Sequence, residues 1–325
     1  MSGVATVRLT LLLLLTVALR ATAFADTPQA LAALNQGRID DAIRLLQSQT
    51  NQNTHDALGH QLLCRAYYSI EIEDSAISEC EAAVAEASSN SDNYLWLGRA
   101  YGLKASRANP VAAFRLARKV AAAFEQAAAL NPTNASALSD LGEFYIAAPS
   151  LVGGGLDKAE KLSDRMMPIS ATKAHRILAL IAEKRGDTAA AEAEFRKAVE
   201  AQPSPDSFID LAAFYQRQKR NDQCVTAIQA ALRLDHAKDA ALVDAASILT
   251  DANRSPQLAQ QLLTTYLASS AKSESAPAPK VHVQLGDMLL KSGDKAAARR
   301  EFMAALALAS SYAPAQKALN SLPAS

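Results

Sequence analysis

The sequence has 325 residues with 33 Lys and Arg and 33 Asp and Glu, so its formal net charge is zero. A balanced charge lacks the basic surface that phosphate-backbone recognition needs, which argues against a nucleic-acid-binding protein. Half of the residues are apolar, only 5% are aromatic, and Gly and Pro are sparse. Good helix formers such as Ala, Leu, Glu and Lys fill most segments, so we expect an all-α protein.

The first 25 residues have the pattern of an export signal. Arg8 precedes an apolar stretch at Leu9–Leu19, and small residues follow it. Cleavage after Ala25 or after Ala23 fits the A-x-A rule. The apolar stretch is shorter than the about 20 residues that a transmembrane helix needs. We therefore expect residues 1–25 to be removed on export and the mature chain to contain no membrane span, with an uncleaved anchor as the alternative.

An internal repeat follows. HQLLCRAYY from His60 aligns with YLWLGRAYG from Tyr94, 34 residues later, and LSDLGEFYI from Leu138 and HVQLGDMLL from His282 repeat the pattern. Each is followed by a second stretch with a small residue and a bulky residue four positions later, as in AEAEFRKAVEAQP around Phe195. Small residues let two antiparallel helices approach closely where they cross. A single hairpin cannot bury its apolar faces alone, so neighbouring hairpins must stack.

The pattern W-x2-L-G-x2-Y then A-x3-F-x2-A-x4-P resembles the tetratricopeptide repeat. The resemblance implies an all-α, right-handed α-solenoid of about eight antiparallel helix hairpins with a C-terminal capping helix. We place seven repeats in residues 26–268, a linker rich in Ser, Ala and Pro in 269–280, and the last repeat with the capping helix in 281–325. Because this linker precedes the last repeat, we expect that repeat to be less firmly docked.

Two turns between paired helices are longer than the repeat requires, at residues 102–112 and 147–157. The first ends near Pro110, a good first-turn residue, so we expect a long second helix from there. The two turns belong to adjacent repeats, so we expect them to project side by side from one edge and to offer a contact surface for a partner.

The second long turn contains the glycines Gly153–Gly155, which invite comparison with a phosphate-binding loop. Such a loop normally follows a strand, whereas this one follows a helix. We interpret it as a turn in which Asp157 caps the next helix, while Leu151 and Val152 form an apolar staple.

Patterns that support catalysis or metal binding are absent. The sequence contains no nucleophile elbow, Walker motif, dinucleotide fingerprint or zinc-binding histidine pair. His60, His175 and His282 occupy the repeat position of Tyr94, where a flat ring packs between repeats, so we interpret them as structural. We predict no catalytic residue, no metal site and no cofactor, and hence a protein that is not an enzyme.

The three cysteines all occupy positions of buried type. Cys64 takes the place of Gly98, and Cys80 takes the place of Phe195 on the facing helix of the same hairpin. An exported protein meets oxidising conditions, so Cys64 and Cys80 are a candidate disulfide, with two free thiols packed as small hydrophobes as the alternative. Cys224 has no partner in either case.

The resemblance implies that first helices line a concave surface. This surface would take an extended or helical peptide with some acidic residues, because its side chains are rich in Arg with apolar patches. The alternative is that they are ordinary solvated side chains. The positions that flank the Leu-Gly pair are Gln61, Arg65, Tyr68, Leu95, Arg99, Leu103, Ser139, Glu143, Ile146, Arg176, Leu180, Glu183, Lys184, Ile209, Gln216 and Arg217.

We therefore expect an interaction scaffold that binds a protein or peptide in an exported compartment, most simply a bacterial periplasm, although a secreted or lumenal location also fits. The runner-up is a periplasmic small-molecule carrier or transporter accessory, with a pocket between the long helix after Pro110 and the glycine turn. A deep closed cavity would favour the carrier, and an open groove would favour the scaffold.

Overall fold

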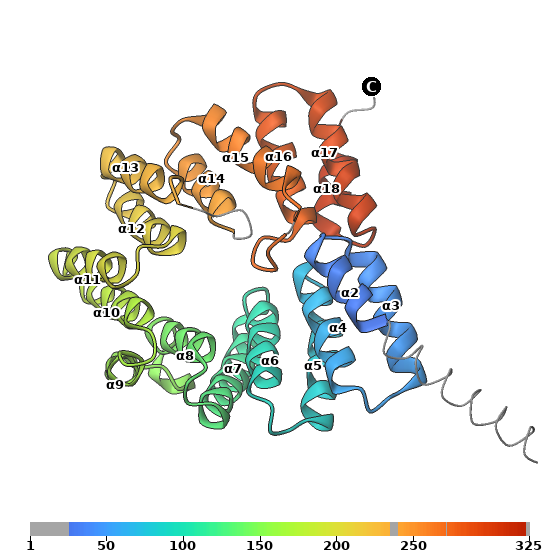
Figure 1. Cartoon of the computed structure of the whole chain (residues 1–325), viewed down its shortest axis with the longest axis horizontal. Coiled ribbons are helices and arrows are strands. Elements are labelled where there is room, and N and C mark those ends of the chain that lie inside the picture. Colours follow the sequence, from blue (N-terminus) through green and yellow to red (C-terminus); the bar gives the residue numbers. More distant parts are fainter. Residues whose placement is uncertain (1–25, 235–239, 271, 323–325) are drawn as a thin grey trace, which may run out of the picture.

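The computed structural model describes residues 26–234, 240–270 and 272–322, and the predicted export signal lies outside them. These residues form α-helices and one 3-10 turn, with no strand among them, and the helices follow one another as antiparallel pairs (Figure 1). The all-α repeat solenoid is confirmed. The pairs are α2 (Asp26–Asn35) with α3 (Ile39–Gln52), α4 (Ala57–Ser69) with α5 (Glu73–Glu86), α6 (Ser91–Ala105) with α7 (Pro110–Leu130), α8 (Ala135–Ala147) with α9 (Leu156–Met166), α10 (Ala171–Arg185) with α11 (Thr188–Ala201), α12 (Pro205–Arg217) with α13 (Asn221–Ala231), α14 (Ala241–Asp251) with α15 (Pro256–Ala268), and α16 (Ala278–Lys291) with α17 (Lys295–Leu308). A last helix, α18 (Ala313–Ser321), packs on α16 and α17.

Across the described residues, every helix is too short or too polar to serve as a transmembrane span.

Polar residues just before the helices explain where many of them begin. Their side chains accept hydrogen bonds from backbone N–H groups of the first turn, which would otherwise lack partners. At α12, Ser204 and Ser207 form a reciprocal capping box, and Pro205 supplies the first turn. The capping residues are Asp56, Asn90, Asn109, Asn134, Ser170, Asp187, Ser204 and Asp294.

Paired helices approach closely where the repeat places glycine. A Cβ atom on Gly98 would lie 2.4 Å from the ring of Phe124, and one on Gly286 would lie 2.4 Å from the ring of Phe302. The aromatic ring of the second helix therefore fills the space that the glycine leaves. In the second hairpin, a disulfide between Cys64 of α4 and Cys80 of α5, with Cα atoms 5.2 Å apart, replaces this contact.

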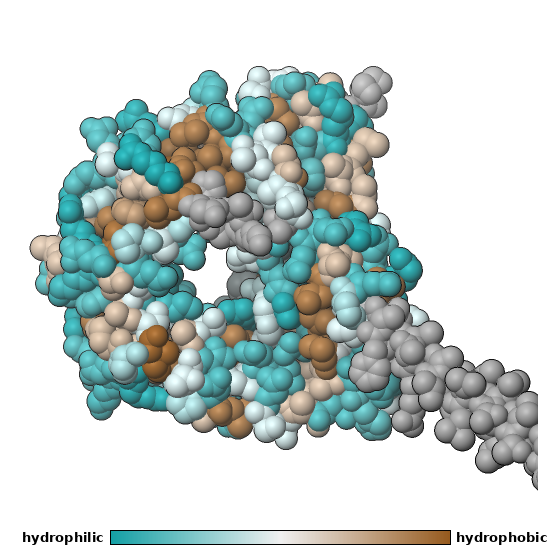
Figure 2. All heavy atoms as spheres, in the orientation of Figure 1, coloured by the Kyte–Doolittle hydropathy of each residue, from teal (hydrophilic) through white to brown (hydrophobic). Residues whose placement is uncertain are grey.

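The solenoid bends into a ring whose first and last hairpins touch (Figure 1). Figure 2 shows the open centre of this ring. The backbone N–H of Ser310 donates to the Asp40 carboxylate at 2.8 Å, and that of Lys272 donates to the Asn35 carbonyl at 2.6 Å. One buried apolar cluster spans the junction and includes Ala30, Ala33, Ile39, Ala42, Leu46, Ala305, Ala309, Tyr312 and Ala315. The capping helix therefore covers the end of the solenoid and also joins it to its beginning.

The long turn predicted at residues 102–112 is wrong, whereas the long helix from Pro110 is present. Helix α6 continues to Ala105, so only residues 106–109 form the turn. The inserted residues are rich in Ala, Arg and Leu and extend the helices instead of the loop. The first turns of α7 extend beyond the core, because buried residues of α7 begin only at Val120.

The glycine turn has a defined backbone. A 3-10 turn, η1 (Ser150–Val152), packs against α7, and Gly155, not Asp157, precedes the first turn of α9. A Cβ atom on Gly154 would lie 1.8 Å from the carbonyl oxygen of Ala148, so only glycine fits there. The staple is half correct, because Val152 is buried while Leu151 is 81% exposed.

The linker ends earlier than predicted, and the last repeat is not loosely docked. Helix α16 begins at Ala278, so residues 278–280 are helical. The repeat packs on α15 at one side and on the first hairpin at the other. The contact with the first hairpin thus holds the last repeat in place, although the linker before it predicted looser docking. Local sequence patterns do not encode this ring closure.

Candidate functional site

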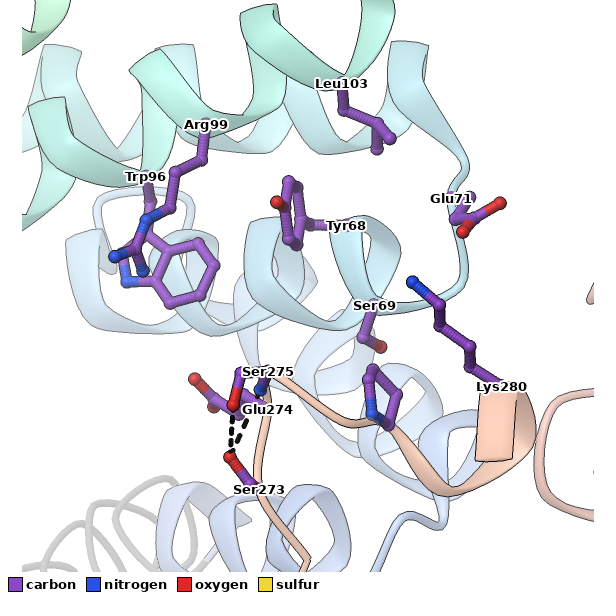
Figure 3. Close-up of a pocket in the computed structure, with 11 residues that line it drawn as sticks. Tyr68, Ser69, Glu71, Trp96, Arg99, Leu103, Ser273, Glu274, Ser275 and Lys280 are labelled. Atoms are coloured by element: carbon purple, nitrogen blue, oxygen red, sulfur yellow. Dashed lines mark hydrogen bonds between the residues drawn. The ribbon is translucent and has the colours of Figure 1, made fainter. Parts of the chain in front are cut away.

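The first helices of the pairs face the centre of the ring, and two hollows open on this inner surface. The first, about 500 Å³, is named here the Trp96 pocket (Figure 3). It is lined by Tyr68, Ser69, Glu71, Trp96, Arg99, Leu103, Ser273, Glu274, Ser275, Pro277 and Lys280. The second, about 420 Å³, is named the Leu180 hollow. It is lined by Glu143, Ile146, Ala147, Leu180, Glu183, Lys184 and Arg217.

The structure gathers most of the predicted groove residues into these hollows. Tyr68, Arg99 and Leu103 line the Trp96 pocket, and Arg65 reaches its Glu274. The Leu180 hollow collects Glu143, Ile146, Leu180, Glu183, Lys184 and Arg217, and Arg176 is paired with its Glu143. Gln216 lines neither hollow.

Four of the predicted groove positions are wrong, because their side chains are buried between neighbouring hairpins. The exposed fractions are 7% for Gln61, 3% for Leu95, 8% for Ser139 and 7% for Ile209. Gln61 donates its side-chain N–H to the Asn93 carboxamide oxygen at 2.6 Å, which ties α4 to α6. Only part of the first-helix face that the repeat suggested therefore reaches the ring centre.

Arginines on the inner surface are paired with carboxylates of neighbouring helices. The Arg99 Nε lies 2.6 Å from Asp140 of α8. Arg176 of α10 bridges Glu143 at 2.6 Å and Asp210 of α12 at 2.9 Å. A similar pair joins Arg217 to Glu183 at 2.7 Å. These pairs connect successive first helices around the ring and leave the apolar residues between them accessible.

Partial burial and neighbouring charges together shift the pKa values of these ion-paired groups. Desolvation raises the pKa of the Asp210 carboxyl, and the Arg176 guanidinium opposes this rise. For Arg176 itself, burial opposes the charged form, but the Asp210 and Glu143 carboxylates outweigh it and hold the pKa above its ordinary value. Desolvation also raises the pKa of the Tyr68 phenol, so Tyr68 faces the Trp96 pocket as a neutral hydroxyl at neutral pH.

Trp96 is the main residue that the sequence argument missed. The guanidinium carbon of Arg99 lies 4.6 Å from its ring centroid, and that of Arg65 lies 5.4 Å from it. The Tyr68 ring contacts it edge-on, with centroids 5.6 Å apart. The signal was available, because this is the single Trp of the chain. Glu274 was also missed, since it reaches the pocket from the linker, 209 residues from Arg65 in sequence.

Three of the histidines are paired with a glutamate of the second helix of their own hairpin, in addition to packing at the repeat position. Each Nδ1 lies 2.6–2.7 Å from a glutamate of the second helix, in the pairs His60–Glu79, His175–Glu194 and His282–Glu301. No group of three His, Cys, Asp or Glu side chains within the described residues has the arrangement of a metal site. Cys224 is a buried free thiol, and its burial raises the thiol pKa.

The glycine turn packs against α7 where a carrier pocket was expected. The Cβ position of Gly153 lies 3.3 Å from the Cβ of Ala121, so the turn packs directly on the helix. The two hollows described above are lined by other elements, chiefly first helices and the linker.

Comparison with known proteins agrees with the repeat pattern. Residues 170–206 and 279–312 each match a family model described as the tetratricopeptide repeat. No sequence among the curated proteins matches the chain.

Solved structures with a similar fold include two that are named as tetratricopeptide repeat proteins. Yeast Tom70 is 18% identical with a TM-score of 0.54, and the match covers 87% of this chain and 57% of that one. A Thermus thermophilus tetratricopeptide repeat protein is 20% identical with a TM-score of 0.47, covering 65% of this chain and 99% of that one. One from Parabacteroides merdae is 14% identical with a TM-score of 0.47, covering 92% and 98%. The repeat pattern, the paired helices and the two family matches together identify the chain as a tetratricopeptide repeat protein.

Proposed function

We propose that this protein is an interaction scaffold that binds an extended segment of a partner protein across the inner surface of the ring. The observation that carries the proposal is the placement of two open, partly apolar hollows on the same surface. First helices form the Leu180 hollow, and first helices together with the linker form the Trp96 pocket. Charged side chains in and between the hollows are held by ion pairs, so the surface is ordered before a partner arrives. An ordered surface loses less conformational entropy on binding.

We propose further that the protein acts in an exported compartment, most simply a bacterial periplasm. Two independent features support this: the signal-like residues 1–25 and the Cys64–Cys80 disulfide, a bond typical of oxidising compartments. Fractionation of native cells, with N-terminal sequencing of the recovered protein, tests it. A periplasmic chain that begins at Asp26 or Phe24 is expected, and a cytosolic full-length chain contradicts it.

Site-specific photo-crosslinking tests the scaffold. A benzophenone amino acid is placed at Leu103 or Leu180 on the inner surface, and at Met303, a 56% exposed residue of α17, as the control. We expect partner adducts from the inner positions and none from Met303. Adducts at Met303 alone would contradict the proposal. The same probe at Leu151, which is 81% exposed, tests whether the glycine turn is an additional contact edge.

A further inference from the structure

We propose that the Trp96 pocket binds an acidic, extended segment of the partner, and that Glu274 of the chain's own linker occupies its carboxylate position in the free protein. The inference rests on the proposed scaffold function and names the chemical class of partner that this part of the surface takes. The partner's carboxylate and the Glu274 carboxylate would therefore compete for the guanidinium of Arg65.

The repeat register explains why Arg65 pairs with the linker. Arg65 and Arg99 occupy equivalent positions of successive repeats, 34 residues apart. The carboxylate partner of Arg99 is Asp140, which stands one residue before the repeat leucine Leu141. Trp96 occupies that same position in the repeat that follows Arg65. The neighbouring helix thus offers Arg65 an aromatic face and no carboxylate, and the acid comes from elsewhere in the chain.

The contact between Arg65 and Glu274 has the geometry of carboxylate recognition. The Arg65 Nε lies 3.0 Å and 3.1 Å from the two Glu274 carboxylate oxygens, and Nη2 lies 2.5 Å from one of them. A forked, charge-assisted arrangement of this kind binds carboxylates with defined orientation. Trp96 supports the guanidinium through a cation–π contact at 5.4 Å. A glutamate or aspartate from another chain would meet the same donors.

The linker is held in place mainly by residues other than Glu274. The Tyr266 hydroxyl donates to the Ala276 carbonyl at 2.8 Å and accepts from the Ser273 N–H at 2.6 Å. The Lys272 ammonium donates to carbonyls at the end of α15, including that of Leu267 at 3.0 Å. The Glu274 side chain can therefore leave Arg65 without the linker backbone moving, which makes this ion pair suited to exchange.

The rest of the pocket favours a segment with a second acid and an apolar side chain. Leu103, Tyr68 and Pro277 supply apolar surface in the same pocket. Lys280 points into the pocket from the opposite side (Figure 3), and its ammonium forms no ion pair with any residue in the described part of the chain. Glu71, the other acid of the pocket, is already paired with Arg107. The unpaired cation adds a second position for a carboxylate.

Trp96 fluorescence reports directly on this site, because it is the only Trp in the protein. The probe is a capped peptide with the sequence of residues 272–279, KSESAPAP, and the matched control peptide is KSQSAPAP. Both are titrated into the wild-type protein and the Glu274→Gln variant. A tethered competitor acts at an effective concentration of about millimolar, so we expect the acidic peptide to bind the variant at least about tenfold more tightly than the wild type.

The control peptide should bind both proteins weakly, and Arg65→Met added to Glu274→Gln should abolish binding of the acidic peptide. Glu274→Asp keeps the charge on a shorter side chain and should give an intermediate affinity. It keeps the test valid if circular dichroism shows that Glu274→Gln is misfolded. Equal affinities of the wild type and the Gln and Asp variants would overturn the occupancy by Glu274. Equal binding of both peptides would overturn recognition of an acidic group.

The outcome is separable from the fate of the scaffold proposal. If the peptide does not bind but inner-surface crosslinks to a partner persist, the scaffold stands and the acidic specificity of the Trp96 pocket is wrong. If the peptide binds but crosslinks form only on the outer helices, the pocket has the proposed chemistry and the scaffold proposal fails.

Discussion

Arg65 and Arg176 both lie on the inner surface of the ring, yet they are held in different ways. Arg176 is fixed between Glu143 and Asp210, which come from the helices on either side of it. Arg65 stacks on Trp96 and takes its carboxylate from a linker 209 residues away. The arc around Arg176 is thus organised by adjacent repeats, whereas the arc around Arg65 depends on the Cys64–Cys80 disulfide and on ring closure. We therefore expect the arc around Arg65, and not the arc around Arg176, to exchange its contacts with a partner.

The disulfide should contribute the largest single effect. Cys64 directly precedes Arg65, and its bond to Cys80 holds α4 on α5. Closing a loop of this size stabilises a folded chain by about 3 kcal/mol. We expect the Cys64→Ser/Cys80→Ser variant, or addition of dithiothreitol, to lower the unfolding midpoint in urea accordingly. Cys224→Ala is the control and should respond to the reductant as the wild type does.

A thiol titration of the denatured protein checks the same point. Without reductant we expect one reactive thiol, that of Cys224, and three with it. Three thiols without reductant would show that the arc around Arg65 is not cross-linked.

Gly37→Ala should open the ring. Gly37 has φ +75°, and an added Cβ would lie 2.6 Å from the Cβ of Ala278 across the junction. Gly186 has φ +79° with nothing within 4 Å of its Cβ position, so Gly186→Ala carries the same backbone strain without the contact. We expect Gly37→Ala to cost about 1–3 kcal/mol more than the control, because overpacking adds to strain.

Small-angle scattering measures the consequence. An open solenoid has a larger radius of gyration than a ring, so only Gly37→Ala should increase it. Equal radii for the two variants would mean that the junction tolerates the added methyl group and that the ring does not depend on this contact.

Arg176→Met should destabilise the other arc in a pH-dependent way. Loss of the guanidinium leaves the half-buried Asp210 carboxylate without a cation, and the pKa of Asp210, already raised by desolvation, should rise further. A carboxyl whose folded-state pKa is raised stabilises the fold at low pH and loses that contribution as pH rises through the folded pKa. We expect a loss of about 1–3 kcal/mol at pH 7 that shrinks toward pH 5.

The control is Lys184→Met, which removes a cation of the Leu180 hollow that forms no ion pair with the described residues. Urea unfolding at pH 7 and pH 5 provides the comparison. If Arg176→Met lowers the free energy of unfolding by the same amount at both pH values, the role assigned to Asp210 is contradicted.

The smallest effect is expected at Glu192 on the outer helix α11. Hydrogen bonds from Arg220, together with those from Arg196 and Tyr215, lower its pKa to about 2. Its contribution is present above the unfolded pKa of about 4.5 and is lost as pH falls toward 2. Glu192→Gln should therefore cost at most about 1 kcal/mol at pH 7 and progressively less between pH 4.5 and pH 3, as thermal unfolding at each pH would show. A difference that grows on acidification would contradict this assignment.

The hairpins could be predicted from sequence because each depends on contacts within about 34 residues, such as Gly98 with Phe124. Ring closure could not, because no local pattern links Asp40 to Ser310. The inner surface was predicted in part. The residues around Leu180 lie on the inner surface as predicted. Gln61 and Leu95 are buried instead, because the repeat pattern does not separate the positions that face the ring centre from adjacent positions that pack between hairpins. Glu274 lay in a linker without repeat register and could not be assigned.

The most direct test of the contrast between the two arcs is a titration followed by nuclear magnetic resonance of arginine Nε–Hε groups. The signals of Arg65, Arg99 and Arg176 are assigned from single Met variants, and the peptide KSESAPAP is added to the wild-type protein at millimolar concentration. We predict that the Arg65 signal moves as the peptide replaces Glu274, while the Arg176 signal stays in place. Equal shifts of Arg65 and Arg176, or a shift of Arg176 alone, would contradict the account.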